Sequence, residues 1–78
     1  MSVMIEVYYP KPADSQREAL ISECIADHAG KVTYREDVSK ETICLTAEFT
    51  TWENADAAMT ALQTDGEHVE GPSAYGGN

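Results

Sequence analysis

Apolar residues recur with two different periods along the chain, and the order of these periods constrains the fold more than any other feature. Residues 3–9, VMIEVYY, alternate with period two, as expected of a strand with one buried face. Residues 42–49, TICLTAEF, alternate in the same way and contain β-branched side chains that suit a sheet. The side chains expected to face the core are Val3, Ile5, Val7, Tyr9, Ile43, Leu45, Ala47 and Phe49.

Residues 15–29 have the period of an α-helix instead. Their apolar stripe consists of Ile21, Cys24, Ile25 and His28. Ser15 and Glu18 have the spacing of a capping box at the helix start, and Gly30 stands where a left-handed residue is expected at the end. A cationic His28 in the last turn would be favoured by the helix dipole.

A second helix is predicted after residue 49. Thr50 and Glu53 form another capping-box pattern, and Asp65-Gly66 ends the helix. Its expected buried stripe is Trp52, Ala55, Met59 and Leu62. Alanines fill much of the remainder and favour the helical conformation.

Residues 31–37, KVTYRED, predict a further strand. Strict alternation places Val32 and Tyr34 on one face and Thr33 and Arg35 on the other. A polar turn, VSKE, connects this strand to the next one.

The segment EHVEG, residues 67–71, predicts a short last strand. The order β-α-β-β-α-β is that of the ferredoxin-like, or split βαβ, fold of the α+β class. In this fold both helices cover one face of a four-stranded antiparallel sheet with the strand order 4-1-3-2. We expect one domain over residues 1–71 and a flexible tail over residues 72–78.

This fold leaves one face of the sheet open, and the alternation predicts which side chains lie on it. The side chains expected to form an interface there are Met4, Glu6, Tyr8, Arg35, Cys44, Thr46, Glu48, His68 and Glu70, with Thr33 on the same face. Tyr8 and Met4 are the expected anchors, because aromatic and large apolar groups dominate the energetics of interfaces.

The charge of the chain limits its partners. The formal net charge is −9, and the chain has no lysine or arginine after Lys40. Such a surface repels nucleic-acid backbones and anionic membranes, so the expected partner is a protein or a second copy of the chain. The N-terminus has no secretory signal pattern, no apolar run is long enough to span a bilayer, and a reduced cytoplasmic setting is expected.

No motif specific to a reaction is present, and we predict no catalytic residue, cofactor or metal. His68-Val69-Glu70 has the H-x-E spacing of zinc deaminases, but the P-C-x-x-C that those enzymes require is missing. A weak metal site formed by Glu6, His68 and Glu70 remains an open alternative. Cys24 and Cys44 are expected on opposite faces of the sheet, too far apart for a disulfide.

Three functions remain compatible with these features. The first is a non-enzymatic interaction module that acts through the open sheet face. The second is an inhibitor that imitates nucleic acid, because the chain resembles phage-encoded anti-CRISPR proteins in size and charge. The third is a cofactor-free enzyme, because the element order is similar to one protomer of the dimeric α+β barrels, such as the antibiotic biosynthesis monooxygenases. A closed apolar pocket between helices and sheet would favour the enzyme.

Overall fold

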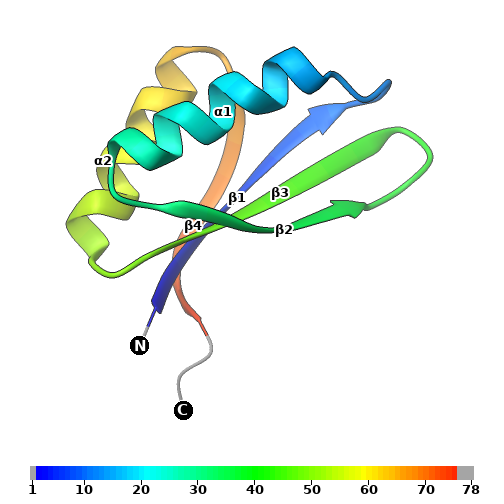
Figure 1. Ribbon diagram of the computed structural model, residues 1–78. Coiled ribbons are helices and arrows are strands. Elements are labelled where there is room, and N and C mark those ends of the chain that lie inside the picture. Colours follow the sequence, from blue (N-terminus) through cyan, green and yellow to red (C-terminus); the bar gives the residue numbers. More distant parts are fainter. Residues whose placement is uncertain (1, 76–78) are drawn as a thin grey trace.

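The computed structural model describes residues 2–75 and confirms the predicted order of elements (Figure 1). The elements are β1 (Ser2–Pro10), α1 (Ser15–Asp27), β2 (Lys31–Asp37), β3 (Thr42–Phe49), α2 (Trp52–Thr64) and β4 (His68–Tyr75). The strands form an antiparallel sheet in the order β2-β3-β1-β4, and both helices lie on one side of it. The chain therefore has the ferredoxin-like α+β arrangement.

The core lies between the helices and the two central strands, as the period-two pattern predicted. Every second side chain of β1, from Val3 to Tyr9, is buried, and the inward side chains of β3 are buried with them. The core cluster consists of Val3, Ile5, Val7, Ile21, Ile25, Leu45, Ala47, Phe49, Ala55, Ala58, Leu62 and Val69. Burial of these groups supplies the main driving force for folding.

One prediction about the core is wrong. Trp52 was expected in the buried stripe of α2, yet it is 44% exposed. Trp52 is the first residue of the helix, and the side that faces the sheet is formed by Ala55, Ala58 and Leu62. The small alanines allow α2 to approach the sheet closely, while Met59 is only partly buried beside the core.

The N-cap of each helix lies one residue away from the predicted cap. The cap of α1 is Asp14, whose side chain accepts a hydrogen bond from the backbone N–H of Arg17, rather than Ser15. The cap of α2 is Thr51, which accepts from the backbone N–H of Asn54, rather than Thr50. In both cases the cap satisfies a free N–H of the first turn without a glutamate at the capping-box position.

The two helices end in the same backbone motif. In α1 the N–H of Gly30 donates to Ile25 O, and the N–H of Ala29 donates to Ala26 O, which is the Schellman pattern. The left-handed residue is Ala29, with φ 62°, so the prediction that Gly30 has this conformation is wrong. Gly30 is required for another reason: a Cβ atom there would lie 2.2 Å from the ring of Phe49.

The last strand is longer than predicted. β4 begins at His68 and continues to Tyr75, past the expected end at residue 71. It pairs with β1 on both sides of an irregularity opposite Ile5. The remainder of the expected tail, residues 76–78, lies outside the described residues.

Candidate functional site

The sheet face opposite the helices is the candidate site, and we call it the open face. Within residues 2–75 no helix covers this face, because α1 and α2 both lie on the other side (Figure 1). Its side chains form three rows across the sheet, and each row takes one residue from β2, β3, β1 and β4 in that order. The rows are Glu36, Cys44, Tyr8 and His68; Tyr34, Thr46, Glu6 and Glu70; and Lys31, Glu48, Met4 and Ser73.

Most of the predicted residues lie where the alternation placed them. Those found on the open face are Met4, Glu6, Tyr8, Cys44, Thr46, Glu48, His68 and Glu70. Cys44 and Thr46 form its buried centre, whereas His68 and Glu70 on the edge strand expose 66% and 59% of their side chains. That these residues contact a partner stays a prediction.

Arg35 is the exception, and its predicted position on the open face is wrong. Val32 lies opposite Ala47 and Tyr34 opposite Thr46, so Thr33 is an extra residue that forms a bulge in β2. Beyond the bulge the alternation is reversed. Arg35 therefore points to the helix side, and Tyr34, 59% exposed, lies on the open face together with Glu36.

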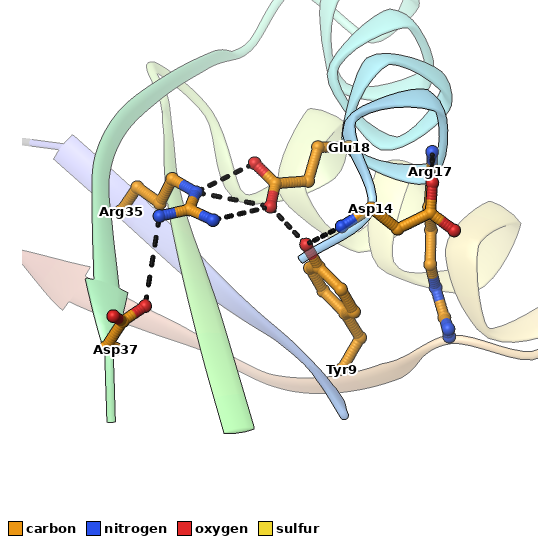
Figure 2. A network of polar contacts seen from close by, with 6 residues as sticks. All are labelled: Tyr9, Asp14, Arg17, Glu18, Arg35 and Asp37. Carbon is orange, nitrogen blue, oxygen red and sulfur yellow. Dashed lines mark hydrogen bonds and ion pairs between the residues drawn. The ribbon is translucent and has the colours of Figure 1, made fainter. Parts of the chain in front are cut away.

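On the helix side, Arg35 joins a polar network at one end of the molecule (Figure 2). Its guanidinium donates to both carboxylate oxygens of Glu18 at 2.9–3.2 Å and lies 3.9 Å from Asp37. The hydroxyl of Tyr9 donates to Glu18 and accepts from the backbone N–H of Asp14 at 3.0 Å. The bond from Arg35 is the main reason why the pKa of Glu18 lies below its ordinary value.

Two other basic side chains, Arg17 and Lys11, also form ion pairs at this end of the molecule. Arg17 makes a two-pronged ion pair with Glu67, at 2.9–3.2 Å, and its guanidinium lies over the ring of Tyr9. Lys11 lies 3.6 Å from Asp37. Three of the five basic residues of the chain are thus paired with acids away from the open face.

Tyr8 is held in place on the open face by its neighbours. Its hydroxyl donates to Glu6 at 3.2 Å, and its ring meets the ring of His68 edge to face, with centroids 5.8 Å apart. Burial, together with the neighbouring Cys44 and Glu6, raises the pKa of Tyr8 to about 12. Tyr8 is therefore a neutral, oriented aromatic group at ordinary pH.

Cys44 lies opposite Tyr8 on the neighbouring strand β3 and does not have the properties of a nucleophile. Burial, and then the negative charge of Glu6, raises the pKa of the thiol. A reactive cysteine requires the opposite shift, toward the thiolate. Cys44 and Cys24 are both free, as predicted, and Cys24 packs against the core on the helix side.

Glu6 and Glu70 face each other directly on neighbouring strands. Among residues 2–75 neither carboxylate has a lysine or arginine within ion-pair distance; Glu6 accepts from Tyr8, and Glu70 contacts His68 Nε2 at 3.1 Å. Like charges in directly opposite positions destabilise a sheet. The open face therefore carries negative charge that the described chain does not neutralise with a basic residue.

The alternative of a metal site at Glu6, His68 and Glu70 finds no support in the geometry. In the part of the chain that the structure describes, no group of three or more His, Cys, Asp or Glu side chains is arranged to hold a metal ion.

None of the helices within residues 2–75 is both long and apolar enough to cross a membrane.

The acidic residues of the second half do not form one continuous array. Glu48 and Glu70 lie on the open face, whereas Glu53 and Asp56 are exposed on α2 and Glu67 is paired with Arg17. A mimic of a nucleic-acid backbone needs regularly spaced charges along one path. The spread of these acids over several faces argues against the interpretation that the chain imitates nucleic acid.

Comparison with known proteins adds no information about function. No family model, no curated protein and no solved structure matches the chain.

Proposed function

We propose that this chain is a non-enzymatic interaction module whose open face binds a basic surface of another protein. The observation that carries the proposal is the direct opposition of Glu6 and Glu70 on neighbouring strands of the open face. Neither has a lysine or arginine partner within residues 2–75. Exposed acids of the helices, such as Glu23 and Glu53, also have no such partner, but they do not face another carboxylate across a strand pair. A basic partner would supply the missing counter-charge and increase the association rate.

Apolar groups on the same face support a docking role. Met4, Tyr8 and Tyr34 lie around the buried pair Cys44 and Thr46. Aromatic groups are enriched at interfaces. The partner would bury Tyr8 on the central strand β1 and Tyr34 on the edge strand β2, and it would pair with the glutamates beside them.

A second copy of the chain is a poorer partner for this face. Glu6, Glu36, Glu48 and Glu70 would be brought toward the same four residues of the other copy, with Lys31 as the basic counterpart. Juxtaposed like charges oppose association. We therefore expect a monomer in solution, which sedimentation at low ionic strength can measure.

The enzyme alternative has less support than the interaction module. Between the helices and the sheet, Phe49, Ile21 and Leu62 are almost completely buried. The hollow of about 370 Å³ beside Ile21 and Leu62 is also lined by the charged residues Arg17, Asp65 and Glu67, so it is not the closed apolar pocket that would favour the enzyme. The fold alone does not imply an activity.

Affinity capture with matched variants tests the proposal. Tagged wild-type protein, Glu70→Lys on the open face and Glu23→Lys on α1 are compared in extracts of the native cell, with mass spectrometry as the readout. Both substitutions change the net charge by the same amount, and both positions are exposed. We expect a basic protein that is retained by the wild type and by Glu23→Lys and lost with Glu70→Lys.

The opposite pattern contradicts the proposal. Loss of the partner with Glu23→Lys and retention with Glu70→Lys would assign binding to the helix side. Circular dichroism of each variant establishes that it is folded before the capture is interpreted.

A further inference from the structure

We infer that the depression beside Tyr8 on the open face binds an arginine side chain of the partner. The inference rests on the proposed function and specifies the chemistry of its central contact. The depression has a volume of about 350 Å³ and is lined by Tyr8, Tyr9, Pro10, Thr42, His68 and Glu70. It lies where β1, β3 and β4 meet at one end of the open face.

Aromatic rings form one part of this depression. The rings of Tyr8 and His68 meet at 61°, so they are not stacked on one another. The hydroxyl of Tyr8 is already bonded to Glu6, which fixes the direction of the ring. A cation over the face of a tyrosine is attracted by the ring, and a planar guanidinium also stacks on it.

A carboxylate forms the other part. Glu70 lines the depression, and Glu6 lies outside the lining, directly opposite Glu70 on β1. Their protein partners are neutral or weakly basic, Tyr8 for Glu6 and His68 for Glu70. A cation in the depression would therefore meet Glu70 directly and would be attracted by the charge of Glu6 on the neighbouring strand.

Arginine fits this arrangement better than lysine. A guanidinium has five N–H donors in a planar fork, so it can donate to both oxygens of Glu70 while its plane lies against Tyr8. A lysine ammonium is a compact, strongly hydrated charge without a flat surface. The depression is shallow and open, which suits a side chain that a protein carries rather than a free small molecule.

NMR titration with two peptides tests this inference. One pentapeptide alternates glycine with arginine, and the other replaces each arginine with lysine. We expect the arginine peptide to shift the amide signals of Tyr8, His68 and Glu70, with an affinity roughly threefold or more above that of the lysine peptide. Equal affinities of the two peptides would overturn the inference.

Two substitutions of Tyr8 separate the ring from general electrostatics. Tyr8→Phe keeps the ring and Tyr8→Leu removes it, and neither changes the charge of the face. The arginine peptide is expected to bind Tyr8→Phe within about twofold of the wild type and Tyr8→Leu roughly threefold more weakly. Equal binding by both variants would show that the ring is not used and would overturn the inference. The amide spectrum reports that each variant is folded.

This test can fail independently of the proposed function. If the captured partner is lost with Glu70→Lys but neither peptide prefers the depression, the interaction module stands and the arginine contact falls. If the arginine peptide binds as expected but no partner depends on the open face, the contact stands and the proposed function falls.

Discussion

At the residue scale, the neighbouring tyrosines Tyr8 and Tyr9 show how one position in a strand decides what a side chain does. Tyr9 points into the protein and is 1% exposed, and its hydroxyl links Glu18 to the backbone of Asp14. Tyr8 points to the open face and bonds Glu6. One contributes to stability and the other is available to a partner.

This difference gives the first prediction. Tyr9→Phe removes a partly buried hydrogen bond to a carboxylate, and we expect it to lower the free energy of unfolding by about 1–2 kcal/mol. Tyr8→Phe removes a single longer bond, to Glu6 at 3.2 Å, whereas the Tyr9 hydroxyl makes two bonds, so Tyr8→Phe should cost less, about 0.5 kcal/mol. Urea denaturation followed by circular dichroism measures both. Equal losses would contradict the assigned roles.

The ends of the two helices give a second prediction at this scale. Ala29 and Gly66 occupy the same left-handed position of two Schellman motifs, with φ 62° and 95°. Ala29→Gly should raise the free energy of unfolding by about 1 kcal/mol, and Gly66→Ala should lower it by about 1 kcal/mol. A Cβ at residue 66 meets nothing within 4 Å, so only the backbone conformation is tested.

Thermal unfolding is a suitable measurement, since about 1 kcal/mol shifts the midpoint by about 4–8 °C in a domain of this size. Ala19→Gly, at an exposed position in the middle of α1, is the control and should destabilise the protein. A stabilising effect at both positions would mean that the left-handed conformation is not the cause.

At the scale of the elements, the alternation of apolar residues predicted the strands and most of the open face, and the order of the elements predicted the strand order of the sheet. The alternation predicted the strands and this face because β1 and β3 are regular strands whose apolar faces allow one register only. It did not predict the bulge at Thr33, since no glycine or proline in residues 31–37 signals an extra residue. Arg35 and Tyr34 were therefore assigned to the wrong faces.

The helix caps were predicted one residue away from their observed positions because that prediction also used a local pattern. Ser15 and Thr50 were chosen because a glutamate follows each at the capping-box spacing, but the side chains of Asp14 and Thr51 provide the cap alone. Glu18 then binds Arg35 instead of the helix start. The contact between Glu18 and Arg35 forms only because the bulge in β2 turns Arg35 to the helix side, so a local sequence pattern could not predict it.

The Glu18–Arg35 contact predicts how stability depends on pH. The pKa of Glu18 is lowered in the folded protein from its ordinary value of 4.5, chiefly by Arg35, so the unfolded chain binds more protons in the range below 4.5. The stabilisation by ionised Glu18 is complete above pH 4.5 and is lost as the pH falls through the folded pKa. Glu18→Gln should cost about 1 kcal/mol at pH 7, because the pair is partly exposed.

The measurement is the difference in unfolding free energy between the wild type and Glu18→Gln, taken by urea denaturation between pH 7 and pH 3. Taking the difference removes most of the general effect of titrating the other carboxylates. We expect the difference to shrink as the pH falls below 4.5. A difference that stays constant would mean that Glu18 is not held in its ionised form by Arg35.

At the scale of the whole molecule, the acids behind the net charge of −9 lie on both sides of the sheet, with Glu6, Glu36, Glu48 and Glu70 on the open face and a larger number on the helices. Near the helix side Arg17, Arg35 and Lys11 are paired with acids. On the open face Glu6 opposes Glu70, a repulsive pair that opposite charges would make favourable. We expect this pair to destabilise the isolated domain, and the binding of a basic partner would offset that cost.

The last prediction tests this expectation. Glu70→Lys replaces the repulsion across β1 and β4 with an attraction, and we expect the free energy of unfolding to rise by about 0.5–1 kcal/mol at low salt. The gain should shrink at high salt, because exposed charges are screened. Glu23→Lys, with the same change of net charge, should give a smaller gain. An equal gain would assign the effect to overall charge rather than to this pair. A substitution that stabilises folding but removes the captured partner would mark Glu70 as a residue retained for binding at the expense of stability.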